Sequence, residues 1–160
     1  LYSFVMNASS GKKFILRGSI EIINDRSKFF IIDNRFSNND KKINLQDKLK
    51  WQNNLFNISA VQNFKKTKLK DYIIVSKNII DEGVYVRSWA HGDRIITHSG
   101  HNIKVKKLLI DNKIPMPYKK HVPIVINREN MILWIPGIAH SEVCSNPISP
   151  FTKISCSNED

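Results

Sequence analysis

The sequence predicts an α+β fold built mainly from antiparallel strands, with one clear helix and one or two short helices. Short β-rich runs recur along the chain, and Gly, Asn, Asp or Pro separate them, as is typical of strands joined by turns. Only residues 103–112 carry apolar side chains at a helical spacing over several turns. With 160 residues and 41% hydrophobic content, the chain can bury a substantial core.

The first third of the chain is predicted to be rich in strands. Residues 1–8 suggest the end of a helix that stops near Gly11. Gly18 and the Asn-Asp pair at 24–25 are turn signals between β-rich runs. Three short strands are therefore expected, over residues 12–17, 19–23 and 29–33.

The middle of the chain has a weaker pattern. Residues 34–50 are polar and predict a loop, whereas the alternation over 51–58 favours a further strand pair. The charge run at 65–70 is expected to be a solvated face. A short strand is predicted over 72–75, after which Ser76 can cap one helical turn.

The second half begins with a strand over 84–87, with Val84 and Val86 inward and Tyr85 and Arg87 outward. Gly92 and Asp93 predict a turn before a short strand at 95–96. A helix is expected over 103–112, with Asn102 as its N-cap and with Pro115 and Pro117 ending it. Its expected apolar face is Val105, Leu108 and Leu109, and its expected solvent face is Lys104, Lys107 and Asp111.

The chain after this helix is predicted to form a hairpin and then a tail. Strands are expected over 124–126 and 132–135, joined by a turn at 128–130. The segment from Ser141 onward is polar and is expected to be mobile. The predicted domain organisation is a strand-rich segment over 1–83, a basic domain over 84–141 and a polar tail over 142–160.

Positive charge is concentrated in the predicted basic domain. Residues 84–128 hold nine Lys or Arg against two Asp, which is +7 of the chain's formal +11. Such a compact basic segment indicates a polyanionic partner, either nucleic acid or an acidic protein. No membrane partner is expected, because the longest apolar run, 131–139, is far shorter than the ~20 residues of a membrane helix. No secretory signal opens the chain, and a cytoplasmic location is expected. Because the first residue is Leu1 and not Met, we expect a fragment of a longer protein.

No catalytic residue, metal site or cofactor is expected in this chain. It has neither a glycine-rich phosphate loop nor a Gly-x-Ser-x-Gly nucleophile turn. His98 and His101 lack a carboxylate or thiol at metal-ligand spacing. Asp93 is expected to organise its own turn by accepting from nearby backbone N–H groups. Cys144 and Cys156 are expected to be free thiols.

Basic side chains are the predicted binding residues. Phosphate binding needs positive donors on a rigid surface, spaced like the phosphates of the nucleic-acid backbone. Base recognition would need exposed aromatic rings as well, for which Trp89 and Tyr118 are candidates, although such residues more often pack in a core or at its rim. The pattern therefore predicts recognition of shape and phosphates. The predicted contacts are Arg87, Arg94, Lys104, Lys106, Lys107, Lys119, Lys120 and Arg128.

An ordered set of motifs resembles a known family. The set spans about 60 residues, Val84 to Ser141, and includes Gly92-Asp93-Arg94-Ile95, Lys104-Val105-Lys106-Lys107-Leu108, Lys113-Ile114-Pro115, Val122-Pro123-Ile124-Val125 and Trp134-Ile135-Pro136-Gly137-Ile138. It is similar to the C-terminal domain of the bacterial tRNA(Ile)-lysidine synthetases, and residues 15–32 resemble the strand-rich segment that precedes that domain. The family often has Arg where this chain has Lys119 and Lys120, so the charge is kept but bidentate phosphate binding is not.

The resemblance implies a function. Enzymes of that family adenylate the wobble cytidine of tRNA(Ile) and attach lysine to it, using ATP with Mg in an N-terminal domain whose nucleotide loop is missing here. This chain would then be a non-catalytic module that recognises the body of the tRNA, and a homodimer could form through the parent enzyme. Two alternatives stay open. One is a module of another tRNA-related enzyme, such as the phenylalanyl-tRNA synthetase β subunit, and the other is a protein-interaction domain with a basic face.

Overall fold

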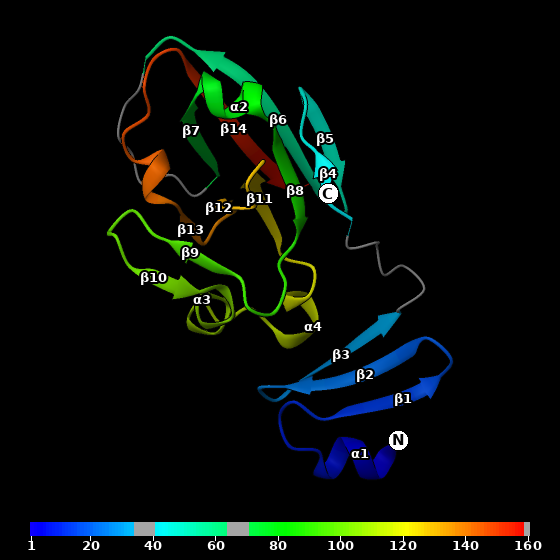
Figure 1. The fold of residues 1–160 in the computed structure, drawn as a ribbon. Helices are drawn as coiled ribbons and strands as arrows, with labels where there is room; N and C mark the ends of the chain where they lie inside the picture. Colours follow the sequence, from blue (N-terminus) through cyan, green and yellow to red (C-terminus); the bar gives the residue numbers. More distant parts are fainter. Residues whose placement is uncertain (34–40, 64–70, 159–160) are drawn as a thin grey trace.

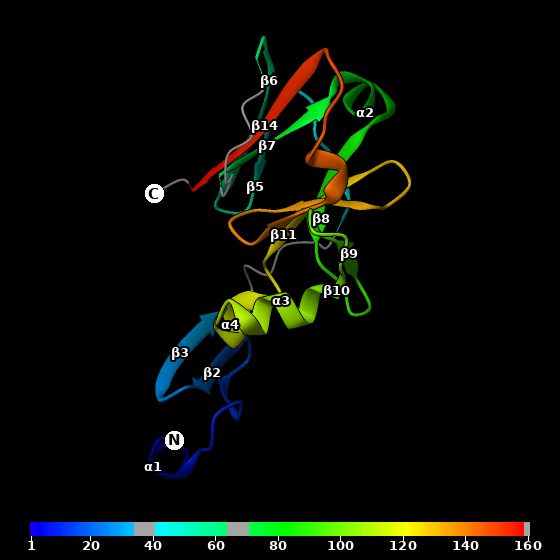
Figure 2. The same cartoon turned by 90° about the vertical axis from the view of Figure 1, so that its left-hand side faces the viewer.

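The computed structural model describes residues 1–33, 41–63 and 71–158. Three larger antiparallel sheets and one two-stranded hairpin make up most of it, and the helices are short (Figure 1). Both views show an elongated molecule, with the N-terminal sheet at one end and α3 and α4 between it and the rest (Figure 2). The predicted α+β fold class is confirmed. The predicted charge run at 65–70 lies outside the described residues.

The N-terminal sheet is a meander of three strands in the order β1–β2–β3. The predicted strands are confirmed as β1 (Lys13–Arg17), β2 (Ile20–Asp25) and β3 (Lys28–Asp33), and the short helix α1 (Tyr2–Asn7) precedes them. The ring of Phe4 in α1 packs at a tilt against Phe14 and edge to face against Phe29, so the helix covers part of one sheet face. Ile22 and Ile23 are the only buried apolar residues among residues 1–33, so this sheet has almost no core of its own.

The four-stranded sheet has the order β5–β6–β14–β7. Its strands are β5 (Lys48–Trp51), β6 (Asn54–Val61), β14 (Phe151–Asn158) and β7 (Tyr72–Ser76). The prediction of a mobile C-terminal tail is wrong, because β14 pairs with β6 on one side and β7 on the other. Thr152 and Ile154 point into the core on alternate positions of this mostly polar strand. The domain boundaries predicted at 83/84 and 141/142 stay a prediction.

The five-stranded sheet has the order β13–β12–β11–β8–β4. It consists of β13 (Ala139–His140), β12 (Ile132–Ile135), β11 (Pro123–Asn127), β8 (Val84–Ser88) and β4 (Ile43–Asn44). The β11–β12 hairpin and the inward positions of Val84 and Val86 agree with prediction. The predicted loop over 34–50 is partly wrong, since β4 and most of β5 fall within it.

The β9–β10 hairpin and the helices connect these sheets. The hairpin pairs β9 (Arg94–Ile96) with β10 (Asn102–Lys104), and α3 (Val105–Asp111) and α4 (Met116–Lys119) follow. The predicted start of the helix at 103 is wrong, because residues 102–104 pair with β9 and Lys104 becomes the N-cap. Helix α2 (Lys77–Glu82) begins after Ser76 as expected, but the Ser76 hydroxyl accepts a hydrogen bond from Ile148 N–H rather than capping α2.

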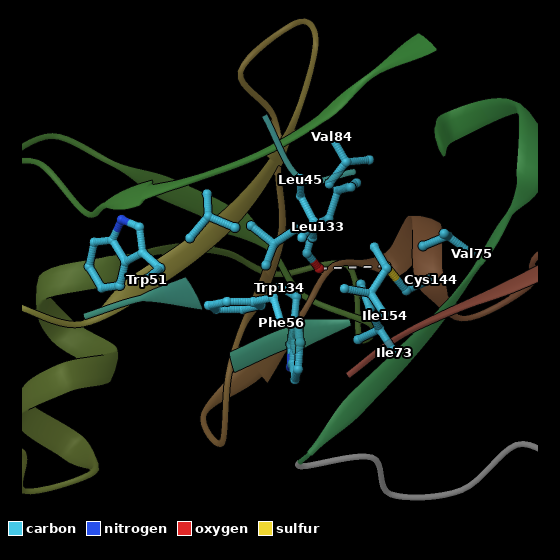
Figure 3. Close-up of a cluster of buried hydrophobic side chains, with 12 residues drawn as sticks. Leu45, Trp51, Phe56, Ile73, Val75, Val84, Leu133, Trp134, Cys144 and Ile154 are labelled. Atoms are coloured by element: carbon cyan, nitrogen blue, oxygen red, sulfur yellow. Dashed lines mark hydrogen bonds between the residues drawn. The ribbon is translucent and has the colours of Figure 1, made fainter. Parts of the chain in front are cut away.

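Two apolar clusters form the core. The first joins the four- and five-stranded sheets and includes the edge-to-face pair Phe56 and Trp134 (Figure 3). Cys144 is the last residue of a 3₁₀ turn (Glu142–Cys144) and packs in this cluster. Its thiol donates to the Leu133 carbonyl (Figure 3). Burial raises the pKa of Cys144 to about 12 and that of Cys156 to about 11, so both free thiols stay protonated at neutral pH.

The second cluster joins α3 to the outer face of the five-stranded sheet. Val105 and Leu109 are fully buried in it, together with Ile95 and strand residues of β11 and β12. Leu108, predicted to be core, is only partly buried. In the described part of the chain, no helix combines the length and the apolar character that a membrane crossing requires.

Truncation within α3 should separate its buried face from its exposed face. Leu109→Ala is expected to lower the free energy of unfolding by about 2–5 kcal/mol, because it opens a cavity in the second cluster. Leu108→Ala should cost less, and Ile110→Ala, at a position 49% exposed, should stay within about 0.5 kcal/mol. Urea denaturation of the three variants measures this ranking. A larger loss for Leu108→Ala than for Leu109→Ala would show that the helix is rotated relative to this structure.

Candidate nucleic-acid interface

An ion pair fixes the loop that follows β8. Arg87 donates two hydrogen bonds to the Asp93 carboxylate, from Nη1 to Oδ2 at 2.8 Å and from Nη2 to Oδ1 at 2.9 Å. Asp93 Oδ2 also accepts from the Ala90 N–H at 2.6 Å, which confirms the prediction that Asp93 organises its own turn. The two side chains are only 19% and 15% exposed. Arg87 therefore holds the loop, and its guanidinium is engaged inside the protein.

The surroundings of Asp93 favour its charged form. Burial alone would raise the pKa of this carboxyl, but the hydrogen bonds from Arg87 and Ala90 and the charge of Arg87 together outweigh burial. The pKa of Asp93 consequently lies below its ordinary value. The folded-state pKa of Asp93 is thus lower than its unfolded-state pKa of about 3.9, and the charged carboxylate stabilises the fold fully at pH values above about 3.9. This stabilisation is lost as the pH falls through the folded-state pKa.

Trp89, in the same loop, is tied to the end of α4. Its indole Nε1 donates to the Lys119 carbonyl, and its backbone N–H donates to the Val122 carbonyl at 3.3 Å. The ring is half-buried against the second core cluster. These contacts hold the indole in one orientation beside α4.

The turn between β2 and β3 is attached to the chain that joins α3 to α4. The Asp25 carboxylate accepts from the Met116 N–H at 2.9 Å, and the Arg26 guanidinium donates to the Lys113 and Ile114 carbonyls at 3.0 and 3.3 Å. Nearby, the rings of Phe30 and Tyr118 meet edge to face with centroids 5.7 Å apart. These contacts place one face of the N-terminal sheet against α4.

A pocket of about 430 Å³ lies between that sheet face and α4. Its apolar lining comes from both sides and consists of Ile23, Ile32, Trp89, Met116 and Pro117. Its polar lining is mostly basic and consists of Lys13, Glu21, His91, Lys106, Lys119 and Lys120. The pocket thus joins an apolar floor to a rim that carries four ammonium groups and one carboxylate.

The structure places three of the eight predicted binding residues at this pocket, namely Lys106, Lys119 and Lys120. Arg94 and Lys104 are register partners on the β9–β10 hairpin, and both are exposed, although Arg94 donates to the Asn102 side chain and carbonyl. Lys107 forms an exposed ion pair with Asp111 at 2.6 Å.

Arg128 lies apart from the others. It follows β11, whose Asn127 pairs with Val84, whereas Pro123, near α4, pairs with Ser88 at the other end of the strand. A strand of five residues separates the two ends by roughly 15 Å. Arg128 is exposed in the hairpin turn and does not line the pocket.

Comparison with known proteins shows which proteins part of this chain resembles. Residues 84–147 match the family model described as "TilS substrate C-terminal domain". Residues 84–147 are therefore similar to a TilS C-terminal domain. The tRNA(Ile)-lysidine synthase of Thermotoga maritima is 40% identical over 70 residues, and that of Lactiplantibacillus plantarum is 37% identical over 51 residues. These matches cover 44% and 32% of this chain, but only 17% and 11% of the relatives.

A solved structure, described as "Crystal structure of TILS C-terminal domain", shares the fold. It superposes with a TM-score of 0.66 at 20% identity, over 75% of this chain and 98% of that chain. The superposition therefore extends beyond residues 84–147.

Sequence reasoning missed the part of the pocket outside residues 84–147. Lys13, Glu21, Ile23 and Ile32 come from strands that precede Lys106 by more than 70 residues. Each sits in a short strand of β1, β2 or β3, where no local signal sets it apart from the other strand residues. Met116 and Pro117 were missed because they are neither charged nor aromatic, and His91 was missed because the prediction rested on Lys and Arg as the phosphate-binding residues.

Replacing Asp93 should reveal a pH-dependent contribution to stability. At pH 7, Asp93→Asn is expected to lower the free energy of unfolding by about 1–3 kcal/mol, because the amide leaves Arg87 without its charged partner. The difference from wild type should shrink as the pH falls below about 4, where the carboxyl of the unfolded chain takes up a proton, and should be lost once the pH has fallen through the lower pKa of the native carboxyl. Urea denaturation across this pH range measures both quantities.

Asp81→Asn is the matched control for this prediction. It breaks an exposed ion pair with Lys77 at 2.7 Å, one helical turn apart, and should change stability by no more than about 0.5 kcal/mol. A difference between Asp93→Asn and wild type that persists unchanged at low pH would contradict the electrostatic explanation.

Proposed function

We propose that this chain binds tRNA as the C-terminal part of a tRNA(Ile)-lysidine synthase. The observation that carries the proposal is the clustering of Lys106, Lys119 and Lys120 of the TilS C-terminal domain with Lys13 of the N-terminal sheet around one pocket. Clustered cations on a folded surface are the electrostatic footprint of a nucleic-acid partner. The names of the relatives supply the class of nucleic acid.

The parent protein would be an ATP-dependent ligase that attaches lysine to the wobble cytidine of tRNA(Ile). In this proposal ATP and Mg bind in a separate catalytic domain, and the residues of this chain hold the body of the tRNA. The chain spans about a sixth of the length of the Thermotoga relatives it matches. We also propose that the parent enzyme acts in the cytoplasm and that it can form a homodimer.

Several exposed cations could neutralise phosphates along one stretch of RNA. Lys104 and Lys106 are exposed near the start of α3, and no ion pair within the described residues engages either of them. Arg94 lies opposite Lys104 in the hairpin. The β9–β10 hairpin leads directly to the pocket, because Lys104 ends β10 and Lys106, which lines the pocket, lies in the first turn of α3. Arg87 contributes indirectly, by fixing the loop that carries Trp89.

Salt dependence tests this function. About four to six neutralised phosphates predict a slope of roughly −3 to −5 when log affinity for tRNA is plotted against log salt. The double variant Lys106→Ala with Lys119→Ala should reduce the magnitude of this slope by about 1–2, since each lysine removed releases one counterion fewer. Fluorescence anisotropy with labelled tRNA measures affinity and slope together.

The control replaces two lysines away from the pocket, Lys48 of β5 and Lys77 of α2. This pair removes the same net charge and should leave the slope unchanged within error. A slope near zero, or equal affinity for an acidic protein, would contradict tRNA binding and favour the protein-interaction alternative.

A further inference from the structure

We propose that the pocket between the N-terminal sheet and α4 binds one unpaired nucleotide of an RNA strand, with its base beside Trp89 and its phosphates on Lys106 and Lys119. This inference rests on the proposed function and deepens it, because it assigns a single-stranded element of the RNA to a defined site. It adds recognition of a base to the recognition of shape and phosphates.

The dimensions and lining of the pocket suit a single base. A volume of about 430 Å³ falls within the usual range of small-ligand sites, whereas paired bases within a helix do not enter such a pocket. The floor is apolar, with Ile23, Ile32, Met116 and Pro117. Trp89 is already fixed by its hydrogen bond to the Lys119 carbonyl, so stacking on it costs little side-chain entropy.

The charges at the rim select an anion. Lys106 of α3 and Lys119 of α4 border the pocket, and neither ammonium forms an ion pair with any described side chain. A ligand that is flat and apolar at one end and anionic at the other matches this arrangement, and a nucleotide within a strand has a phosphate on each side of its sugar. RNA with several phosphates therefore fits better than a free mononucleotide.

Glu21 adds a preference among bases. Its side chain lines the pocket, is 23% exposed and has Lys13 as an ion-pair partner at 3.4 Å. An ionised carboxylate only accepts hydrogen bonds, so it favours the exocyclic amine of cytosine or adenine over the carbonyl that uracil carries in its place. The pocket should consequently prefer cytidine or adenosine to uridine.

Short single-stranded RNAs test the site in the 160-residue chain. The probes are trinucleotides of cytidine, adenosine or uridine, labelled for anisotropy, together with unlabelled CMP and ribose 5-phosphate as competitors. The cytidine and adenosine trinucleotides are expected to bind about fivefold more tightly than the uridine trinucleotide. Glu21→Gln should remove this preference, because an amide can pair with either kind of base. In NMR spectra, the Trp89 indole N–H signal should shift on binding.

Two lysines that follow one another on α3 provide matched variants. Lys106→Ala should weaken trinucleotide binding about fivefold, through the loss of one phosphate contact. Lys107→Ala, which removes an equal charge at a residue that does not line the pocket and is paired with Asp111, should change it by less than about twofold. Equal losses for the two variants would show general charge attraction and overturn the assignment to the pocket.

Other results would also overturn the inference, and they are distinguishable from failure of tRNA binding. CMP that competes as well as the cytidine trinucleotide would indicate a free-nucleotide site, and equal competition by ribose 5-phosphate would exclude base recognition. If tRNA binds with the expected salt slope while trinucleotides leave Trp89 unchanged, the inference fails and the proposed function stands. If trinucleotides bind in the pocket as described but tRNA shows no salt-dependent binding, the proposed function fails instead.

Discussion

The basic pocket depends on the attachment of the β2–β3 turn to the chain between α3 and α4. Asp25 and Arg26 lie at that turn, and their side chains form hydrogen bonds with backbone groups of residues 113–116. Asp25 accepts from one backbone N–H and Arg26 donates to two carbonyls. Arg26 and Ser27 both adopt positive φ, 50° and 64°, which closes the tight turn that presents these side chains. Without this attachment, the N-terminal sheet would not be held against α4, and the pocket would lose the wall that the sheet supplies.

A second polar contact fixes the opposite wall. Arg87 and Asp93 close the loop after β8, and the loop in turn positions Trp89 against the carbonyl of Lys119. The two walls are attached in the same way, because in each case a turn or loop side chain donates to backbone carbonyls of another segment. Arg26 donates to the Lys113 and Ile114 carbonyls, and Trp89 donates to the Lys119 carbonyl. Rigid loops of this kind let cations from separate elements hold a fixed spacing, which phosphate recognition requires.

Strand β14 shows where local polarity misled the prediction. Five of its eight residues, Phe151–Asn158, are polar or charged, and two prolines precede it, so the segment has the composition of a mobile tail. Its alternation places only Thr152 and Ile154 in the core, and backbone hydrogen bonds to β6 and β7 supply the rest of its stabilisation. Those partners lie some 75 to 100 residues earlier in the chain, beyond the range of any periodicity argument.

The sequence by itself determined the local elements and the chemistry of the basic segment. The turn residues and apolar alternation predict β1, β2, β3, β8, β11 and β12, because these signals act between near neighbours. The surroundings of each cation were decided only by the tertiary structure. Arg87 forms an ion pair with Asp93, Lys107 forms an ion pair with Asp111, and Arg128 follows the end of β11 that is far from the pocket. The pocket itself combines Lys13 with Lys119, and only long-range packing brings residues so distant in sequence to one surface.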